Sequence, residues 1–456
     1  MKWAMWLYPG LKIKRWMALS FLGIFLAGAS ASLLLEGQFF GYLESLILQL
    51  TKQLEPAALT LVGIILFACG LLLHILGFIR MVRSIYQVVA PEKERKLVEV
   101  LYRRRSLERG AKIVVIGGGT GLSVLLRGLK EYTSNITAIV TVSDDGGSSG
   151  RLRDDLGIVA PGDIRNCLVA LADTESEMDQ VLNYRFAQGE LSGHNLGNLL
   201  LAGAAQSAGS FEKAVALISK VLAVRGQVLP STLSNVTLCA LLRNGQYIRG
   251  ETAITAVDGA IRSVFLDPED CQPLPQTVTA IQEADAIIIG PGSLYTSLLP
   301  NLLVQGIAES LAVTKAPKIY VCNVMTQPGE TDGYKASQHL QAINSHCRRN
   351  IIDYMIVNTE KIPQQLLRKY EKQGQKPVAV DYKNLEKQGC QVIRAKLINQ
   401  EDLVRHNPLR LSETIIDLVM EEKEQQKGVN LIDLLLFKRK RSRSLADQNL
   451  FNRFKG

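Results

Sequence analysis

The sequence predicts a doubly wound α/β domain with a mostly parallel sheet, preceded by two helices that could cross a membrane. Between residues 112 and 358, apolar β-rich runs repeatedly end in glycine or polar loops and continue as amphipathic segments. This alternation is typical of strands and helices in a parallel sheet. Two long uncharged runs precede it, and the 456 residues suffice for one large or two medium domains with a substantial core.

The uncharged runs cover residues 16–35 and 56–79. Because about 20 apolar residues in a helix span a hydrocarbon core of roughly 30 Å, residues 1–90 predict a transmembrane hairpin. Basic residues flank the pair on its outer ends and the connecting segment is acidic. The positive-inside rule then predicts a multi-pass protein of the inner or plasma membrane, with both termini and the main domain cytoplasmic. Residues 29–31 also resemble a signal-peptidase site, and cleavage there would remove only the first helix.

The positive charge lies in the flanks of the chain. Residues 1–110 hold 14 Lys and Arg against 7 Asp and Glu, residues 421–456 hold 9 against 5, and the total is +9. Since the middle is slightly acidic, the charge favours a membrane surface and argues against a nucleic-acid partner. The seven scattered cysteines form no C-x-x-C pair, which argues against a disulfide framework or a structural zinc site.

Composition divides the rest of the chain into three parts. Residues 91–110 are highly charged and predict a solvated helical linker, and residues 111–410 predict the α/β domain. Residues 411–456 predict a C-terminal helix and a basic tail. Such a tail could hold anionic lipid or serve as a disordered solubilising segment, and the sequence leaves both alternatives open.

Two glycine loops predict anion-binding sites. Gly117–Gly121 follows the apolar run 112–116 but lacks the third glycine of a dinucleotide fingerprint and the lysine of a Walker A loop. Its backbone N–H groups could still approach a phosphate at a helix N-terminus, although glycine turns after strands are often only tight turns. Gly290–Ser297 is a second loop of this kind. In open parallel sheets, ligands bind beyond the carboxyl ends of the strands, where both loops are expected.

Three further loops carry polar side chains, at residues 144–151, 161–166 and 193–198. The paired Asp144 and Asp145 could hold a ribose, a Mg²⁺ ion or a proton, or form an ordinary Asp-Gly turn. Arg165 falls in the first turn of a helix, where it opposes the helix dipole unless it meets an anion. His194 lies in a polar cluster at a helix start, which suits a base or sugar but also suits a structural role.

The segments IGGGTGLSVLLRGLK, TVSDDGGSSGRLR, PGDIRNCLVAL, GHNLGNLLL, GPGSLYTSLLPNLLV and CNVMTQPGETDGY occur in this order. With them, the chain from about residue 111 to 408 resembles the gluconeogenesis-factor family, whose relatives include the 2-phospho-L-lactate transferases (CofD-like). The resemblance implies a CofD-like, Rossmann-related fold that binds a UDP-sugar such as UDP-N-acetylglucosamine. It also implies a role in cell shape and wall synthesis on gluconeogenic carbon sources. The two N-terminal helices depart from typical members.

The resemblance implies that Gly118–Gly121 face the diphosphate, that Asp144, Asp145, Ser148 and Ser149 lie by the sugar or ribose, and that Tyr370 stacks on uracil. The full set of candidate ligand-binding residues is Gly118, Gly119, Thr120, Gly121, Asp144, Asp145, Ser148, Ser149, Asp163, Arg165, Asn166, His194, Asn195, Asn198, Gly292, Ser293, Tyr295, Asn323, Tyr370 and Arg405. Asp144 and Asp145 are also the candidate ligands of Mg²⁺, the one cofactor considered.

The sequence leaves three functions open. The domain could be a regulatory binder that reports on a nucleotide sugar to cell-wall-synthesis proteins at the membrane. It could be a transferase that moves a phosphoryl-linked group with Mg²⁺, although the sequence offers no clear catalytic base besides the two Asp and His194. It could also be a scaffold. The sequence leaves open whether the chain forms homo-oligomers.

Overall fold

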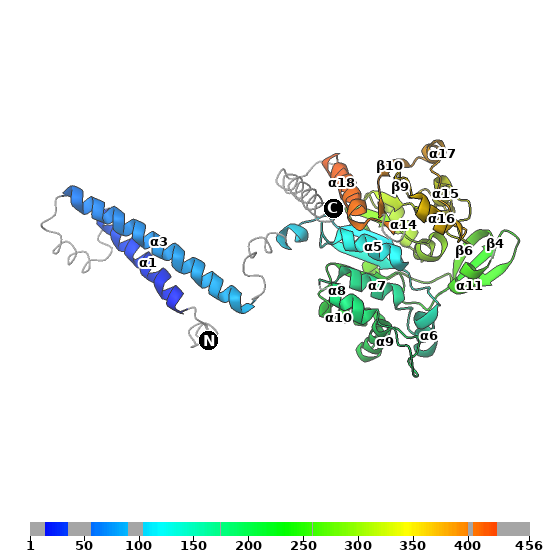
Figure 1. Cartoon of the computed structure of the whole chain (residues 1–456), viewed down its shortest axis with the longest axis horizontal. Coiled ribbons are helices and arrows are strands. Elements are labelled where there is room, and N and C mark those ends of the chain that lie inside the picture. Colours follow the sequence, from blue (N-terminus) through cyan, green and yellow to red (C-terminus); the bar gives the residue numbers. More distant parts are fainter. Residues whose placement is uncertain are drawn as a thin grey trace. The chain divides into compact units, whose positions relative to one another are not determined.

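The computed structural model describes residues 14–34, 56–89, 104–173, 175–257, 259–399 and 405–425. The chain divides into two compact units, Met1–Arg104 and Arg105–Gly456. Figure 1 shows the elements of both units.

The first unit contains two helices that pack closely side by side, α1 (Lys14–Leu34) and α3 (Pro56–Val89). Glycines permit the close approach: a Cβ atom on Gly70 would lie 2.6 Å from the backbone nitrogen of Ala27. Towards the other end of the pair, Ser20 Oγ lies 2.9 Å from His74 Nδ1. Ala27 of α1 lies beside Gly70 of α3, and the earlier residue Ser20 lies beside the later residue His74. The two helices are therefore antiparallel.

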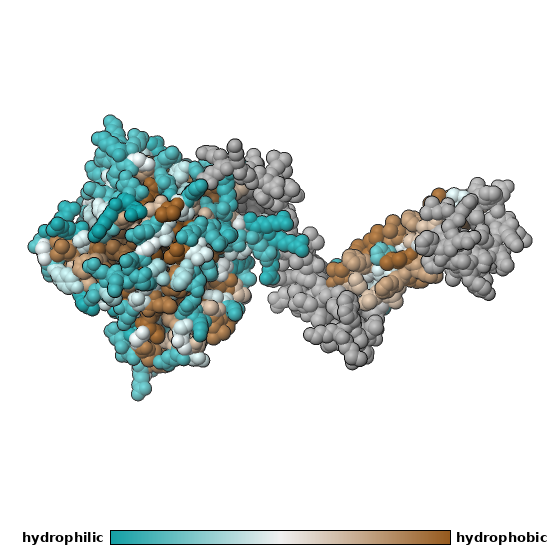
Figure 2. Space-filling model, turned by 180° about the vertical axis from the view of Figure 1, so that it is seen from behind, coloured by the Kyte–Doolittle hydropathy of each residue, from teal (hydrophilic) through white to brown (hydrophobic). Residues whose placement is uncertain are grey.

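Within the described residues, one helix is long and apolar enough to cross a membrane by length and composition, Thr60–Ser84. The apolar part of α1, Arg15–Ala31, is shorter. Both helices expose large apolar side chains such as Phe21 and Leu72, and Figure 2 shows the hydrophobic surface that results. The second predicted span is therefore present as a candidate, whereas the first falls short in length and a two-helix membrane hairpin stays a prediction.

The second unit is built on a seven-stranded sheet in which every pair of neighbours is parallel. The strand order is β10-β9-β8-β7-β1-β2-β3. The strands are β1 (Ile113–Gly117), β2 (Ile136–Val140), β3 (Gln227–Pro230), β7 (Ala286–Ile289), β8 (Lys318–Val321), β9 (Tyr354–Asn358) and β10 (Gln391–Ala395). The central strands β1 and β7 are buried along their whole length, as continuous apolar runs predict for a sheet covered on both faces.

The order of the strands places a topological switch point between β1 and β7. From β1 the chain moves outward to β2 and β3, and from β7 it moves in the opposite direction to β8, β9 and β10. Since crossovers between parallel strands are right-handed, the helices after β1 and β2 cover one face and those after β7 and β8 cover the other. The predicted doubly wound α/β fold is confirmed.

The helices on the first face include α5 (Gly119–Leu129), α6 (Gly147–Leu156), α7 (Gly162–Leu171), α8 (Glu175–Leu182), α9 (Leu196–Ala208) and α10 (Phe211–Val221). After β7 come a π-helical turn η3 (Leu294–Leu298), α13 (Leu299–Leu302), α14 (Ile307–Val313), α15 (Ala336–Cys347), α16 (Gln364–Glu371) and α17 (Tyr382–Lys387). The last described helix, α18 (Pro408–Gln425), packs against α5. It runs across residue 410, where the sequence suggested a boundary.

A small antiparallel sheet, β5-β4-β6, is inserted between β3 and β7. Its elements are β4 (Thr237–Leu242), β5 (Tyr247–Arg249), α11 (Glu251–Ala256) and β6 (Ile261–Asp267), with α12 (Pro275–Gln282) leading back to the main sheet. A second small antiparallel pair, β11 (Ile398–Asn399) and β12 (Arg405–His406), lies just before α18. Both additions contribute residues near the ends of the parallel strands.

Candidate functional site

Two glycine loops meet at the switch point. One follows β1 and the other follows β7, and a Cβ atom on Gly121 would lie 2.7 Å from the carbonyl oxygen of Pro291. Gly119 has φ +66°, in the left-handed region that favours glycine. The side chain of Asn323, just after β8, donates from Nδ2 to the carbonyl of Gly292 at 2.9 Å. The loops are therefore held against one another by steric fit and by an amide.

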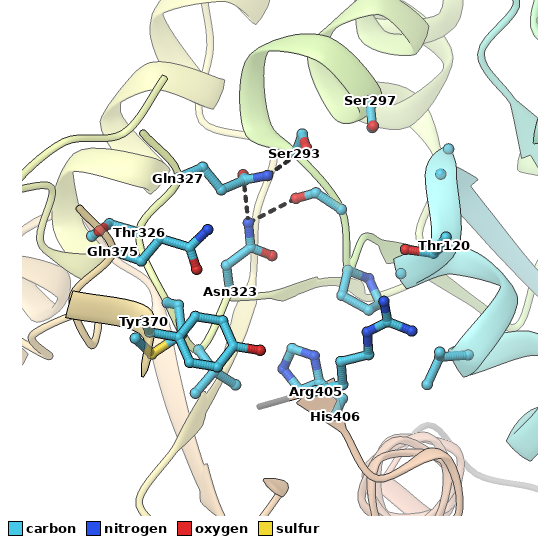
Figure 3. Close-up of a pocket in the computed structure, with 18 residues that line it drawn as sticks. Thr120, Ser293, Ser297, Asn323, Thr326, Gln327, Tyr370, Gln375, Arg405 and His406 are labelled. Atoms are coloured by element: carbon cyan, nitrogen blue, oxygen red, sulfur yellow. Dashed lines mark hydrogen bonds between the residues drawn. The ribbon is translucent and has the colours of Figure 1, made fainter. Parts of the chain in front are cut away.

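A cavity of about 350 Å³ opens beside these loops at the carboxyl ends of the strands. Its walls include Gly118–Gly121, Gly292 and Ser293, and α16 contributes Tyr370. Figure 3 shows the Arg405 and His406 side chains next to one another at one side of the cavity. The other polar side chains in the lining are Thr120, Ser297, Asn323, Thr326, Gln327 and Gln375.

The cavity has a polar end and an apolar end. At the polar end, Gln327 Nε2 donates to Ser293 Oγ at 2.5 Å, and Asn323 Nδ2 donates to Gln327 Oε1 at 3.1 Å (Figure 3). These bonds fix the loop after β7. At the apolar end, Tyr370 packs with a small cluster that contains Val324 and Met325. This division suits a ligand that is charged at one end and flat and apolar at the other.

One backbone N–H of the glycine loop after β1 is already used in a hydrogen bond within the protein. Gly119 N donates to Asp163 Oδ2 at 2.6 Å. The following amides, those of Thr120 and Gly121, lie in the first turn of α5, where backbone N–H groups have no intrahelical partner. They are therefore the loop's available donors for an anion.

Behind Asp163, carboxyl groups crowd together at the ends of β1 and β2. Burial raises the pKa of Asp163 to about 6, although the Gly119 N–H acts in the opposite sense. Burial, reinforced by Asp144 and Asp163, raises the pKa of Glu251 to about 9. Burial also raises the pKa of Glu330 to about 7, while the N–H of Tyr295 and the hydroxyl of Thr296 donate to its carboxyl group. At neutral pH the cluster therefore carries protons as well as negative charge.

Asp145 joins the small sheet to this cluster. Its Oδ1 accepts from the N–H of Thr252 at 2.9 Å and from the Thr252 hydroxyl at 2.6 Å, in the first turn of α11. Asp144 Oδ1 accepts from Gly146 N at 2.9 Å. In the described part of the chain no group of three His, Cys, Asp or Glu side chains is arranged to hold a metal. Because Mg²⁺ commonly binds one or two carboxylates together with substrate phosphates, the Asp144–Asp145 magnesium site stays a prediction.

A second polar network links α6, α7 and α9. The hydroxyl of Ser148 accepts from Asn195 N at 3.1 Å and lies 3.3 Å from His194 Nδ1. Asn198 accepts from Arg165 Nη1 at 2.8 Å. Arg165 also donates to Asn166 Oδ1 at 2.7 Å, and Asn198 Nδ2 lies 3.4 Å from Ser149 Oγ. The arginine that opposes the helix dipole is thus paired with amide oxygens, and burial lowers the pKa of His194.

The structure distributes the predicted site residues over three places. The cavity is lined by Gly118, Gly119, Thr120, Gly121, Gly292, Ser293, Asn323, Tyr370 and Arg405. The carboxyl cluster and the second network hold Asp144, Asp145, Ser148, Ser149, Asp163, Arg165, Asn166, His194, Asn195 and Asn198. The side chain of Tyr295 lies in none of these places. The residue is 2 % exposed and its hydroxyl lies 2.9 Å from the hydroxyl of Tyr334, so the ring belongs to the core, although the backbone N–H donates to Glu330.

Several residues of the site were not predicted. Glu330 and Gln327 lie in the segment CNVMTQPGETDGY, whose similarity to a family could have identified them. His406 lies next to the predicted Arg405 and shares its strand. Glu251 follows a glycine at the start of a short helix, and in the sequence it cannot be distinguished from an ordinary helix-start glutamate.

Fold and site together define a doubly wound α/β protein with a cavity beside two glycine loops at its switch point. The model of the family described as 2-phospho-L-lactate transferase CofD matches residues 113–398. A putative gluconeogenesis factor of Nostoc sp. is 47% identical over 422 residues, covering 91% of this chain and 92% of that protein. The gluconeogenesis factor of Bacillus subtilis is 50% identical over 68% of this chain and 98% of its own length. The chain belongs to the gluconeogenesis-factor family, within the CofD family.

Solved structures agree with this assignment. The crystal structure of protein BH3568 from Bacillus halodurans has a TM-score of 0.66 and 50% identity, and the match covers 68% of this chain and all of that one. The Nostoc alignment is longer than the whole second unit, so it extends into the first. The first unit is therefore matched in at least one relative.

Proposed function

We propose that the cleft binds a UDP-sugar, with UDP-N-acetylglucosamine as the first candidate, and that the protein regulates cell morphogenesis and wall synthesis during gluconeogenic growth. The observation that supports this most is the meeting of two glycine loops beside a cavity that contains both an arginine and a tyrosine. The names of the relatives support the physiological part.

The polar end of the cavity suits a diphosphate. The free amides of Thr120 and Gly121 point from the positive end of the α5 dipole, and an anion there is stabilised by both effects. Arg405 adds a permanent positive charge and can donate two parallel hydrogen bonds to phosphate oxygens. Ser293, fixed by Gln327, offers a further polar group on the opposite loop.

The apolar end suits a pyrimidine base. Tyr370 presents a flat ring beside Val324 and Met325, and aromatic side chains commonly stack on bases. The sugar would then extend past Gly119 towards Asp163 and the carboxyl cluster. Carboxyl groups there can accept hydrogen bonds from sugar hydroxyls, and the protonated ones can donate.

The test is titration of the full chain in detergent with UDP-N-acetylglucosamine and Mg²⁺ by calorimetry, with chromatography of the same samples. Saturable binding without product supports the regulator. Arg405→Met, which removes the charge and keeps the aliphatic stem, is expected to weaken binding at least about tenfold. The exposed Arg349→Met is the matched control. A chain that binds neither UDP-sugars nor guanine nucleotides would leave only a scaffold.

A transferase is the second candidate, favoured by the match to the 2-phospho-L-lactate transferase family and by the carboxyl cluster. Groups such as Glu330, with a pKa of about 7, are suited to general acid–base work near neutral pH. Mg²⁺ at Asp144 and Asp145 would neutralise the charge of a nucleotide diphosphate. Product formation in the same samples would establish this activity.

We further propose that α1 and α3 form a hairpin in the cell membrane, with both termini and the second unit in the cytoplasm. The apolar exposed faces and the basic flanks support this arrangement. Reporter fusions test it: a fusion after residue 45 should report the outside, and fusions after residue 105 or at the C-terminus the cytoplasm. Partners among cell-wall-synthesis proteins and self-association are part of the same proposal.

A further inference from the structure

His406 occupies a special position in the cavity. It lies on β12, whose pairing with β11 places it opposite Ile398, and the residue is 8 % exposed. Together with Tyr370 and Arg405 it lines the cavity, and Figure 3 shows its ring between those two side chains. His406 therefore lies where the apolar and the polar ends of the cavity meet.

The ring carries a hydrogen-bonding group that the protein does not use. In the described part of the chain, His406 Nε2 is buried and has no hydrogen-bond partner. Native proteins leave few buried polar atoms in this state, and such atoms point to a missing ligand or water. The unused nitrogen is thus a second sign, independent of the glycine loops, that something binds here.

The protonation state of the His406 ring determines which kind of ligand group can form a hydrogen bond with Nε2. Burial lowers the pKa of His406 to about 4, while a hydrogen bond with the backbone of Cys322 acts in the opposite sense. At neutral pH the ring is therefore uncharged, with one N–H and one lone pair. Because a backbone carbonyl accepts from the N–H, the unpartnered Nε2 is left as the acceptor. A neutral acceptor cannot hold a phosphate, a task that suits the adjacent Arg405, so it requires an N–H or O–H of the ligand.

We infer that His406 selects the base of the bound nucleotide, with Nε2 accepting a hydrogen bond from the imide N3–H of a uracil that stacks on Tyr370. This inference rests on the proposed function and specifies its nucleotide. Uracil presents a donor at N3, whereas cytosine presents a lone pair at the same position. Two lone pairs facing one another repel, so the site discriminates against cytidine nucleotides by the polarity of one atom. A site that accepts a hydrogen bond from a ligand donor strongly rejects analogues without that donor, because the acceptor of the site is then left unpartnered.

The apolar surroundings explain why the base, and not the sugar, meets His406. Tyr370 and its neighbours Val324 and Met325 form one apolar cluster that lines the same cavity as His406. The hydroxyl-rich sugar would instead meet the carboxyl groups near Asp163. The base therefore fits the end of the cavity that His406 closes.

The experiment uses the full chain in detergent and removes the proposed hydrogen bond in two ways, by changing His406 in the protein and by changing N3 of the base in the ligand. Calorimetry gives the affinities of wild type, His406→Phe and His406→Gln for UDP, N3-methyl-UDP and CDP. Phenylalanine keeps the ring and removes the acceptor, and glutamine places an amide oxygen near the position of Nε2. We expect wild type to prefer UDP at least about tenfold over both analogues, His406→Phe to lose most of this preference, and His406→Gln to recover part of it.

Two outcomes would overturn the inference. Equal binding of UDP and N3-methyl-UDP by wild type excludes the hydrogen bond whether or not the variants fold. An unchanged preference in a folded His406→Phe, checked by its melting temperature, assigns the selection to another group. A wild-type chain that binds no uridine compound at all fails differently, since it removes the proposed function together with this inference.

Discussion

Replacing Gly121 by alanine tests the fit of the two glycine loops. Gly121 is the third residue of α5, and the added Cβ would lie 2.7 Å from the carbonyl oxygen of Pro291, 3.1 Å from its carbonyl carbon and 3.3 Å from Gly292 N. All three atoms belong to the backbone, so no side chain can rotate away. Since ordinary contacts begin at 3.4 Å, the loop after β7 must retreat by about 0.7 Å, the difference between 3.4 and 2.7 Å.

This displacement sets the expected losses of stability and of ligand affinity. Overpacking of this kind typically costs about 1–3 kcal/mol of unfolding free energy. The same shift moves Gly292 and Ser293 away from the amides of Thr120 and Gly121, so a diphosphate can no longer contact both loops at full strength. We expect the affinity for UDP-N-acetylglucosamine to fall at least about tenfold, which corresponds to about 1.4 kcal/mol.

The assay is calorimetric titration of the full chain, with melting temperatures measured on the same samples. Gly203→Ala is the matched control, because Gly203 also lies in a helix, α9, and an added Cβ meets nothing within 4 Å. That variant should bind as wild type does and gain up to about 1 kcal/mol of stability from helix propensity. If Gly121→Ala binds as tightly as Gly203→Ala, the two loops do not jointly hold the ligand and the reasoning is wrong.

Three further predictions concern individual side chains. Asp144→Ala should lose at least tenfold in ligand affinity, on the order of 1.4 kcal/mol, whereas the exposed Asp154→Ala should not; equal affinities in titration would remove that loop from the site. Tyr370→Leu should weaken binding by about 1–3 kcal/mol through lost stacking, measured in the same way, and undiminished affinity would place the base elsewhere. Glu251 has a pKa raised from 4.5 to about 9, so its contribution to stability is complete below pH 4.5 and is lost as pH rises towards 9. Melting temperatures should therefore fall less steeply between pH 5 and 9 in Glu251→Gln than in wild type, and parallel curves would contradict the raised pKa.

The sequence predicts the sheet well because its strands are nearly pure apolar runs. Residues such as Ile287 and Val115 are fully buried, and a run of that kind followed by a glycine loop has few other structural uses. The two glycine loops are predictable for the same reason, since each directly follows such a run. Parallel strands bring their carboxyl ends to one edge, so the loops after β1 and β7 meet although they are distant in the sequence.

Side-chain direction and long-range partners are less accessible to the sequence. Tyr295 follows a glycine loop and looks like a ligand contact, yet a π-helical turn directs its ring into the core beside Tyr334. Asp145 bonds to Thr252, more than a hundred residues away, and no local pattern reveals that pairing. Glu251 matters because the fold buries its carboxyl group beside other carboxyl groups, a property of the folded chain alone.

The most direct test of the proposed binding mode is a crystal structure of the chain with UDP-N-acetylglucosamine bound. We expect the diphosphate to lie between the amides of Thr120 and Gly121 and the loop at Gly292 and Ser293, with the uracil against Tyr370. A diphosphate bound away from both glycine loops, in a chain that binds the compound in solution, would contradict this binding mode.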